Sequence, residues 1–183
     1  MAIRGATDDQ LATRVRKSDH RAFQELFYRY YRILHHFFQA RASDRELAAD
    51  LSQETFVRLW SQREALDPEN SVKAYLFRTA RNLLIDHYRK QQVRRDYEEY
   101  EASAAPRVSP PDHSGMLAKE IEKSIGGLPE PQREVFTMNR FEGVSYREIA
   151  EVMGVSVKTV EKRMSDALKT LRREIYEKSD TKT

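Results

Sequence analysis

Hydrophobic residues recur every three or four positions along most of the chain, which is the spacing of one apolar face on an α-helix. The clearest run lies between Asp19 and Arg41, where phenylalanine, leucine and tyrosine residues repeat at this spacing. Runs in which Val, Ile and Thr alternate with polar residues, the pattern of β-strands, are nearly absent. The pattern therefore predicts an all-α fold.

Polar residues that can cap a helix stand at the start of the apolar runs in the first half of the chain. Thr7 and Gln10 have the spacing of a capping box, in which each side chain bonds the backbone of the other. Asp44 can cap a helix that ends near Gln62. Together with the run from Asp19, these signals predict three helices before residue 63.

A turn is predicted at residues 66–71, because proline and short polar residues interrupt the apolar pattern there. Asn70 or Ser71 can cap the helix that follows, which should run to about Gln91 with Tyr88 on its apolar face. The four helices can share one core of aliphatic and aromatic side chains.

Residues 93–115 have a different composition, acidic at first and then rich in proline. Because this segment cannot continue a helix, it is typical of a flexible linker between two domains. The predicted organisation is a four-helix domain over residues 1–92, a linker over 93–115 and a second helical domain over 116–183. The second domain should contain helices over 116–125, from Pro131 to Gly143, from Ser145 to Gly154 and from Ser156 to about Tyr176.

The chain carries 32 Lys and Arg against 29 Asp and Glu, a net charge of +3, and this charge is unevenly distributed. Residues 73–95 have a net charge of +6, residues 96–115 of −4 and residues 155–175 of +3. Basic helices are typical of nucleic-acid binding, but a charged run can also be an ordinary solvated helix face. Charge alone does not separate these two interpretations.

What the sequence lacks excludes several classes of protein. It has no cysteine, which excludes disulfides and thiolate zinc sites. No apolar run approaches the ~20 residues that span a bilayer, and the N-terminus lacks the apolar core of a signal peptide, so we expect a cytoplasmic protein. The five histidines show no metal-ligand spacing and belong to no recognisable acid/base pair. We therefore expect no catalytic residue, no metal ion and no other cofactor.

Residues 145–164 have the pattern of a helix-turn-helix. Ala150 is small enough for two helices to cross closely, and Gly154, four positions later, can adopt the positive φ that the turn needs. A helical hairpin that merely packs is the alternative, but it does not explain the capping box of Ser145 and Glu148 or the basic outer face. The residues that can lock the second helix onto the first are Ile149, Met153, Val155, Val160 and Met164.

The second helix of this motif should have two faces. Val157, Val160 and Met164 lie on the apolar stripe and are expected to face the core. The outward residues near the start of the helix would meet base edges in the major groove. Ser156 and Thr159, at the positive end of the helix, suit a phosphate.

The helix predicted after residue 71 has cations interleaved with aromatic residues, a composition that suits single-stranded nucleic acid because unpaired bases stack on rings. Its rings are Tyr75, Phe77 and Tyr88. The alternative is that Tyr75 and Tyr88 belong to the core, and we favour this alternative for Tyr88.

Several segments together resemble the sigma-70 family of bacterial RNA polymerase sigma factors. Asp50–Trp60 resembles the second conserved region of these factors, and Ala74–Asp86 resembles the promoter-melting helix that follows it. Gly127–Phe136 and the helix-turn-helix resemble the fourth region. The regions between these in larger sigma factors are absent, so the chain resembles the extracytoplasmic-function (ECF) group.

The resemblance implies a factor without an active site that binds core RNA polymerase and carries it to a promoter. In the family, the helix that matches Asp50–Trp60 docks on a coiled coil of the largest core subunit, and carboxylates and an amide on one face suit a basic partner helix. The alternative is an ordinary solvated helix face with Trp60 in the core. The implied core polymerase-binding residues are Asp50, Gln53, Glu54, Arg58 and Trp60.

The resemblance also implies two surfaces for promoter DNA. The opened −10 element would be captured by Asn70, Ser71, Lys73, Tyr75, Arg78, Arg81, Asn82, Arg89 and Lys90. The −35 element would be read by Arg147, Ser156, Lys158, Thr159, Glu161, Lys162, Arg163, Ser165 and Asp166. Many family members carry basic residues where this chain has Glu161 and Asp166. A carboxylate accepts from cytosine N4 but repels phosphate, so either the −35 sequence differs from the commonest one or Asp166 makes no DNA contact.

The resemblance implies one more partner, because ECF factors are commonly held inactive by an anti-sigma protein. The competing function is a stand-alone helix-turn-helix regulator that binds operator DNA without polymerase. The two functions differ in whether core polymerase is needed for promoter-specific binding.

Overall fold

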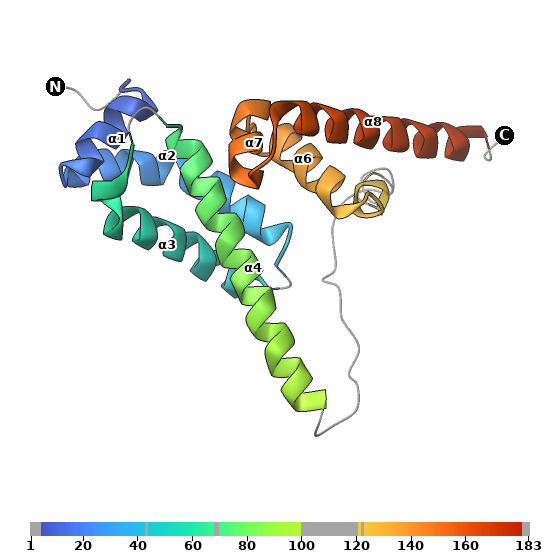
Figure 1. Cartoon of the computed structure of the whole chain (residues 1–183), viewed down its shortest axis with the longest axis horizontal. Helices are drawn as coiled ribbons and strands as arrows, with labels where there is room; N and C mark the ends of the chain where they lie inside the picture. Colours follow the sequence, from blue (N-terminus) through green and yellow to red (C-terminus); the bar gives the residue numbers. More distant parts are fainter. Residues whose placement is uncertain (1–4, 43, 68–69, 100–120, 122, 181–183) are drawn as a thin grey trace. The chain divides into compact units, whose positions relative to one another are not determined.

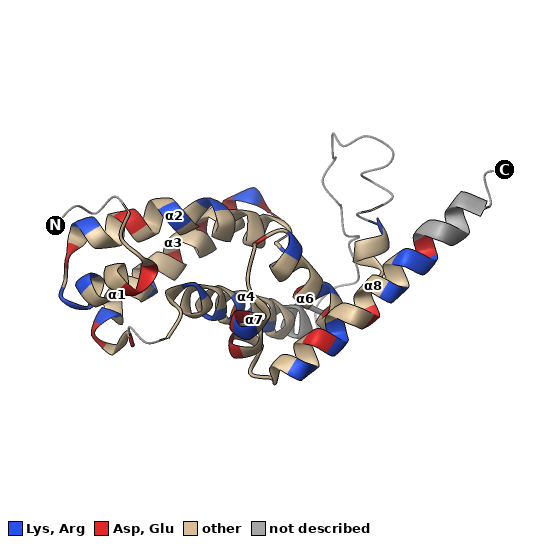
Figure 2. Cartoon of the chain, turned by 90° about the horizontal axis from the view of Figure 1, so that it is seen from above, with Lys and Arg blue, Asp and Glu red and all other residues tan. Residues whose placement is uncertain are grey.

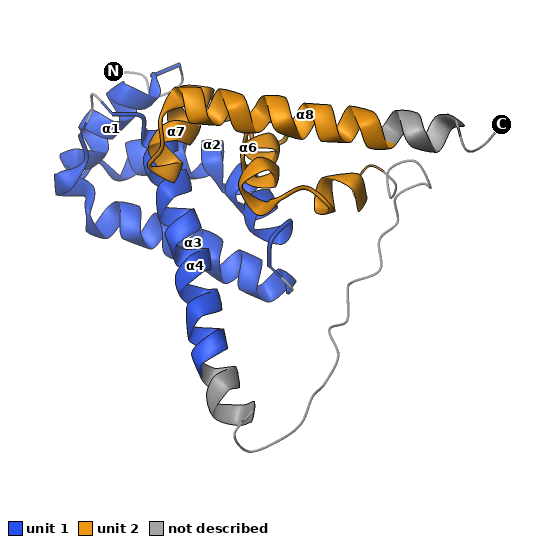
Figure 3. Ribbon diagram, turned by 45° about the vertical axis from the view of Figure 1, so that its right-hand side comes forward, with its two compact units in different colours: residues 1–110 blue, residues 111–183 orange. Residues whose placement is uncertain are grey.

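The computed structural model describes residues 5–42, 44–67, 70–99, 121 and 123–180, and the regular elements in these ranges are all helical (Figure 1). The chain divides into two compact units, unit 1 over Met1–Pro110 and unit 2 over Pro111–Thr183 (Figure 3). The all-α class with two helical units is confirmed. From residue 100 onward the predicted linker lies outside the described residues.

Unit 1 is built from four long helices and one 3₁₀ turn within its described residues. They are α1 (Asp8–Arg16), α2 (His20–Gln39), α3 (Arg45–Ser61), η1 (Arg63–Ala65) and α4 (Val72–Glu99). α2 packs against α1 and α3, and α4 packs across α3 and α2 (Figure 1). The centre of this unit is filled by fully buried side chains from all four α-helices, among them Leu11, Leu26, Phe37, Leu59, Leu76 and Phe77.

The polar caps expected from the sequence are present in unit 1. The Gln10 backbone N–H donates to Thr7 Oγ1 at 3.4 Å, and the Thr7 N–H donates to Gln10 Oε1 at 3.1 Å, which confirms the capping box. Asp44 Oδ1 accepts a backbone N–H of α3 at 3.1 Å. Of the two candidates for α4, it is Ser71 that caps, since its Oγ accepts from the Ala74 N–H at 3.2 Å.

Asp19 caps α2 and also ties it to α1. Its Oδ1 accepts from the backbone N–H groups of Arg21 at 2.9 Å and Ala22 at 3.2 Å. Its Oδ2 accepts from Arg14 Nε at 2.8 Å. Because the bonds from Arg14 and from Ala22 favour the ionised carboxylate, they lower the pKa of Asp19 below its ordinary value.

α4 continues to Glu99, beyond the end that the sequence predicted near Gln91. Residues 93–99, expected in the linker, are therefore helical. They contain no glycine or proline and include several Arg and Glu, which are good helix formers. Acidic composition does not end a helix, whereas proline does, and the first proline after α4 is Pro106.

Tyr88 on α4 is 42% exposed, so its predicted place in the core is wrong. Its hydroxyl donates to the backbone carbonyl of Arg41, in the turn after α2. The apolar spacing predicts which side of α4 faces the neighbouring helices but not how far they cover it. Tyr88 lies where that cover is incomplete.

Unit 2 contains α6 (Glu130–Arg140), α7 (Tyr146–Met153) and α8 (Val157–Asp180), and residues 123–126 are also helical. Both α6 and α7 pack against α8. The predicted helix over 116–125 lies partly outside the described residues. The buried side chains of the three helices include Val135, Met138, Ile149, Val160, Met164 and Ala167.

The helix-turn-helix is formed by α7 and α8, as the sequence predicted. The Glu148 N–H donates to Ser145 Oγ at 3.3 Å and the Ser145 N–H donates to Glu148 Oε2 at 2.8 Å, which completes the second capping box. Gly154 ends α7 in the left-handed region, with φ +65°. The N–H of Val155 then donates to the Ala150 carbonyl at 3.0 Å, closing the turn.

Candidate functional site

One face of α3 carries the residues expected to bind polymerase. Asp50 and Gln53 are exposed, and Arg58 Nε donates to Glu54 Oε1 at 3.0 Å in an i,i+4 ion pair. Val57 shares this face by helical spacing and is 56% exposed. Val57 could not be singled out from the sequence, since it lies off the apolar stripe of α3. The face thus combines a carboxylate, an amide, an internally paired Glu–Arg and an apolar side chain.

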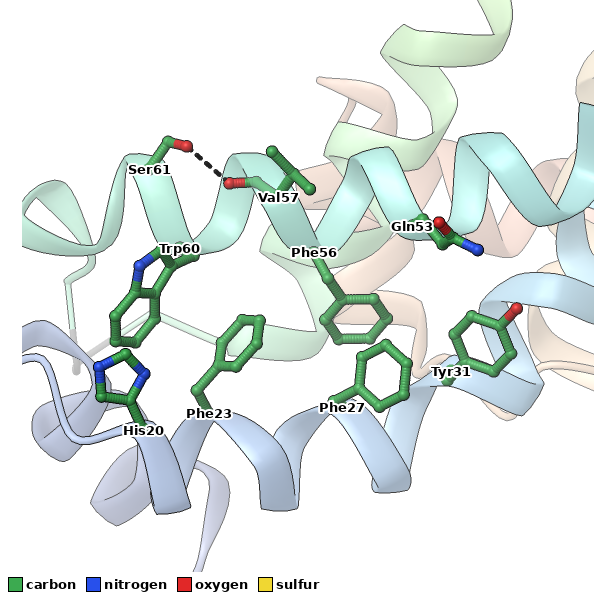
Figure 4. Close-up of a pocket in the computed structure, with 9 residues that line it drawn as sticks. All are labelled: His20, Phe23, Phe27, Tyr31, Gln53, Phe56, Val57, Trp60 and Ser61. Carbon is green, nitrogen blue, oxygen red and sulfur yellow. Dashed lines mark hydrogen bonds between the residues drawn. The ribbon is translucent and has the colours of Figure 1, made fainter.

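Trp60 lies at one end of an apolar groove between α2 and α3, which has a volume of about 540 Å³ (Figure 4). Its ring centroid is 4.4 Å from that of His20 and 5.1 Å from that of Phe23. Further along, the rings of Phe27 and Phe56 are 4.8 Å apart, and the aromatic side chains of the two helices lie between them (Figure 4). Trp60 is half-buried, so it belongs to the packing of unit 1 and to its surface at once.

The residues before and at the start of α4 already have partners within the chain. Asn70 Nδ2 donates to Asp67 Oδ2 at 2.7 Å. The Tyr75 hydroxyl donates to Gln62 Oε1 at 3.0 Å, and the Tyr75 ring is half-buried. Ser71 is occupied as the cap of α4. These contacts fix the side chains that the resemblance assigns to the −10 element, and they leave the Asn70 Oδ1 as an acceptor.

Arg78, Asn82 and Arg89 lie on one exposed face of α4. Spacings of four and eleven residues return to nearly the same side of an α-helix. Ile85 lies on the same face and is 46% exposed. The face therefore combines two cations, one amide and one apolar side chain.

Of the other three cations predicted for the −10 surface, Lys73 and Lys90 do not share this face, and Arg81 lies at its edge. By helical geometry, Lys73 lies about 140° around α4 from Arg78, and Lys90 lies about 120° from it. Arg81 lies about 60° from Arg78. Lys73 and Arg81 are half-buried, whereas Lys90 is exposed. The structure thus brings together only part of the predicted set.

The start of α8 presents most of the residues predicted to read the −35 element. Lys158, Glu161, Lys162 and Ser165 are exposed, and Asp166 is half-buried. Figure 2 shows basic and acidic residues alternating along α8 rather than forming one basic stripe. Contacts here would therefore depend on individual side chains more than on a uniform positive field.

Three of the predicted −35 residues make contacts within unit 2. Ser156 Oγ accepts from the Thr159 N–H at 3.1 Å and bonds the Thr159 hydroxyl at 2.9 Å, so it caps α8. Arg163 is half-buried, with Nη1 3.9 Å from the sulfur of Met153 on α7. Arg147 on α7 is exposed.

Val157 is 41% exposed, so its predicted place in the core is wrong. It is the first residue of α8 and stands between Ser156 and Lys158. Its stripe is buried at Val160, Met164 and Leu171, where the other helices of unit 2 cover it. The sequence shows the apolar stripe of α8 but not at which residue the other helices begin to pack against it.

Two features are absent from the part of the chain that the structure describes. The described residues contain no group of three or more His, Asp or Glu side chains that could hold a metal ion. None of their helices is long and apolar enough to cross a membrane.

Comparison with known families decides what these surfaces belong to. Residues 26–94 match the family model Sigma-70 region 2, and residues 118–171 match Sigma-70, region 4. The RNA polymerase sigma-H factor of Pseudomonas aeruginosa is 31% identical, over 86% of this chain and 88% of that protein. The ECF RNA polymerase sigma-E factor of Haemophilus influenzae is 29% identical over 92% of this chain and 95% of its own length. The chain belongs to the ECF group of the sigma-70 family.

Solved structures agree with this assignment. A structure titled as CnrH in complex with the cytosolic domain of CnrY covers 92% of this chain and 96% of that chain, with a TM-score of 0.69 and 28% identity. A complex of the sigma factor RpoE with the anti-sigma factor NepR from Bartonella quintana shares the fold, with a TM-score of 0.67 and 22% identity over 84% of this chain and 96% of that chain.

As an ECF sigma factor, the chain binds core RNA polymerase and directs it to promoters. The region 2 match includes all of α3 and much of α2 and α4, and with them most of the groove lining, although His20 and Phe23 precede the matched residues. The region 4 match includes the whole helix-turn-helix. The region 2 match thus contains the candidate residues on α3 and α4, and the region 4 match contains those on α7 and α8.

Proposed function

We propose that this sigma factor recognises promoter DNA with two separate surfaces and docks on polymerase with a third. The −10 surface lies on α4, the −35 surface at the start of α8, and the docking surface on α3. The observation that carries the proposal is the shared face of Arg78, Asn82 and Arg89, because it belongs to a unit that does not contain the helix-turn-helix. A stand-alone operator-binding regulator has no use for a second nucleic-acid surface of this kind.

On α4, Arg78 and Arg89 are spaced to hold the backbone of an opened strand, and Asn82 between them has donors and an acceptor for a base. Tyr75 offers an aromatic ring for stacking at the start of the helix. Asn70 can accept from an extruded base through Oδ1 while its Nδ2 remains on Asp67. Ser71 and Arg81 border this surface, whereas Lys73 and Lys90 lie on other sides of α4.

At the start of α8, individual side chains suit individual bases in the major groove. Lys162 can donate to guanine, and Glu161 can accept from cytosine N4. Val157, exposed and apolar, suits the methyl group of thymine. The capped N-terminus at Ser156, together with Arg147 and Lys158, suits the flanking phosphates.

On α3, Asp50 and Gln53 suit a basic partner helix, and Val57 and Trp60 add apolar area beside them. Glu54 and Arg58 form an ion pair at the surface. Because such a pair contributes little free energy, it can open at modest cost so that either charge meets a partner protein. The similar sigma factors CnrH and RpoE were solved with CnrY and an anti-sigma factor. We extend this to the present chain and propose that an anti-sigma protein is a further partner.

The test uses sigma-free core polymerase and a DNA library with randomised −35 and −10 segments. The full chain is added, and the transcripts are sequenced. We expect transcripts only when chain and core are both present, and they should share one pair of sequence motifs. If the chain selects the same DNA without core and adds no transcripts, it is a stand-alone regulator and the proposal is wrong.

Two sets of variants assign the surfaces. Gln53→Ala with Asp50→Ala should weaken binding to core and leave the free chain folded. Arg78→Ala with Arg89→Ala should retain core binding but lower the permanganate reactivity of thymines in the opened −10 segment. If both sets changed only the same step, the division between docking and DNA capture would be refuted.

A further inference from the structure

Arg63, in η1 directly after α3, makes three contacts that join separate parts of unit 1. Its Nε donates to the Ser18 hydroxyl at 2.8 Å, and its Nη1 donates to the backbone carbonyl of Trp60 at 2.9 Å. Its guanidinium carbon is 4.8 Å from the centroid of the Trp60 ring. The Arg63 side chain is only 25% exposed, whereas Glu64, at 3.9 Å from it, is 84% exposed. The specific contacts are therefore those to Ser18 and Trp60.

The hydrogen bond from Arg63 to Ser18 lies at the end of the groove. Ser18 has φ +63°, a backbone conformation that non-glycine residues rarely adopt. It stands directly before Asp19, which caps α2, and the first residue of α2 is His20, whose ring is 4.4 Å from that of Trp60. The hydrogen bond from Arg63 to Ser18 thus ties the start of α2 to the end of α3, where Trp60 borders the groove.

The chemistry of arginine suits this arrangement. A planar guanidinium can donate in two directions and lie over an aromatic ring at the same time, which the single ammonium of lysine cannot do. The backbone bond to Trp60 and the ring contact to Trp60 come from the same side chain. The indole is therefore held by Arg63 as well as by the rings of His20 and Phe23.

We propose that Arg63 is a positioning residue, which fixes the Trp60 ring at the end of the groove in the orientation used for docking on polymerase. The proposal rests on the docking role proposed above for α3. Arg63 itself need not touch polymerase, because it acts through the position of the indole. Loss of Arg63 should then lower the affinity for core without removing a docking residue.

The chain provides its own reporter, because Trp60 is its one tryptophan. Its fluorescence and its quenching by acrylamide measure the position and exposure of the indole in the free, full-length protein. A residue that only stabilised the fold would leave these signals unchanged in the native state. The spectroscopic readout therefore separates positioning from general stability.

The experiment compares Arg63→Gln and Arg63→Lys with Arg21→Gln, an exposed arginine of α2 that removes the same charge. We expect both Arg63 variants to change Trp60 emission and raise its acrylamide quenching, and Arg21→Gln to change neither. Affinity for core should fall about five- to tenfold in the Arg63 variants, as expected for a lost ring contact and hydrogen bonds. Ser18→Gly removes the hydroxyl but accepts the positive φ, so it should fold well and give a smaller loss in the same direction.

A double-mutant cycle with Trp60→Leu decides the mechanism. If Arg63 acts through the indole, Arg63→Gln should weaken core binding less than twofold in the Trp60→Leu background. An equal loss in both backgrounds, or an unchanged Trp60 signal in Arg63→Gln, would overturn the proposal. If Arg63→Gln leaves core affinity intact while Gln53→Ala and Asp50→Ala lower it, the docking surface stands and the role of Arg63 is refuted. If none of them lowers it, the docking surface is wrong as well.

Discussion

The hydroxyl of Tyr75 on α4 donates a hydrogen bond to the side-chain oxygen of Gln62, at 3.0 Å, directly after the end of α3. It links the helix proposed to dock on polymerase with the helix proposed to hold the opened strand. The loop between these helices contains Asn70. A residue proposed to face DNA is therefore anchored by the segment that follows the proposed docking helix.

Substitutions at Tyr75 should separate its ring from its hydroxyl. Tyr75→Phe removes the bond to Gln62 but keeps the ring, so we expect a loss of about 0.5 kcal/mol in the unfolding free energy of the chain and nearly normal promoter opening. Tyr75→Ala also removes a stacking surface worth roughly 1–3 kcal/mol per base. Permanganate footprints and chemical denaturation measure the two effects. Equal promoter opening by both variants would exclude stacking on Tyr75.

Lys162 should contribute to the choice of the −35 sequence. Lys162→Ala is expected to weaken recognition of the selected promoter by about 1–3 kcal/mol and to relax the preference at one base pair. Lys169→Ala is the matched control, since Lys169 is exposed on the same helix but lies two turns further from its start. It should change affinity for all sequences alike or not at all. Promoter selection from the randomised library measures both, and an unchanged motif for Lys162→Ala would remove Lys162 from the reading surface.

Val157 should detect a thymine methyl group. With the wild-type chain, replacing one −35 thymine by uracil should weaken binding about fourfold, the equivalent of one buried methylene at ~0.8 kcal/mol. In Val157→Ala that difference should disappear, because the apolar partner is gone. The same replacement at the other −35 thymines is the internal control. If no position loses its methyl preference in Val157→Ala, Val157 does not face a base.

Position 154 requires glycine because of its backbone conformation, and not because a side chain would lack room there. A Cβ there would meet no atom within 4 Å, but φ is +65°. Gly154→Ala should therefore lower the stability of unit 2 by about 1–2 kcal/mol through strain alone. Gly126 is the control, since a Cβ there also meets nothing within 4 Å and its φ is not positive. Thermal unfolding should show Gly126→Ala unchanged or slightly more stable, and an equal loss in both variants would contradict the argument.

Asp19 should make unit 1 sensitive to acid. Its folded pKa is lowered, mainly by the bond from Arg14, so the carboxylate stabilises the fold fully above its unfolded pKa of 3.8 and loses this effect as the pH falls through the folded pKa. Asp19→Asn can still cap α2 but cannot pair ionically with Arg14. The stability difference between wild type and Asp19→Asn, measured by denaturation between pH 7 and pH 3, should shrink at the acidic end. A difference that stays constant would show that Arg14 and Asp19 are not coupled.

Local signals predicted the helix boundaries well where a single side chain decides them. The capping boxes at Thr7 and Ser145 and the glycine turn at Gly154 were all readable, because each depends on residues within four positions of one another. The end of α4 was not predicted, because an acidic composition does not stop a helix and residues 93–99 contain no proline or glycine.

The candidate site was predicted by residue type but not by arrangement. The stripes that contain Phe27 and Phe56 suggested a closed core; Phe56 is buried as expected, whereas Phe27 is only half-buried along the groove. Arg63 gave no signal at all, since its partner Ser18 is far from it in the sequence. The spread of Lys73 and Lys90 away from Arg78 could have been derived from the sequence, because the helix predicted to about Gln91 already contained all three residues.

The sequence by itself determined the helical class, the caps, the helix-turn-helix and the family resemblance, because these rest on spacing and on short-range hydrogen bonds. Only the tertiary structure decided that Val157 and Tyr88 are exposed, that Trp60 borders a groove and that Arg63 holds it. The physical reason is that burial depends on where neighbouring helices begin and end. That is a property of several distant segments together, and no single apolar stripe contains it.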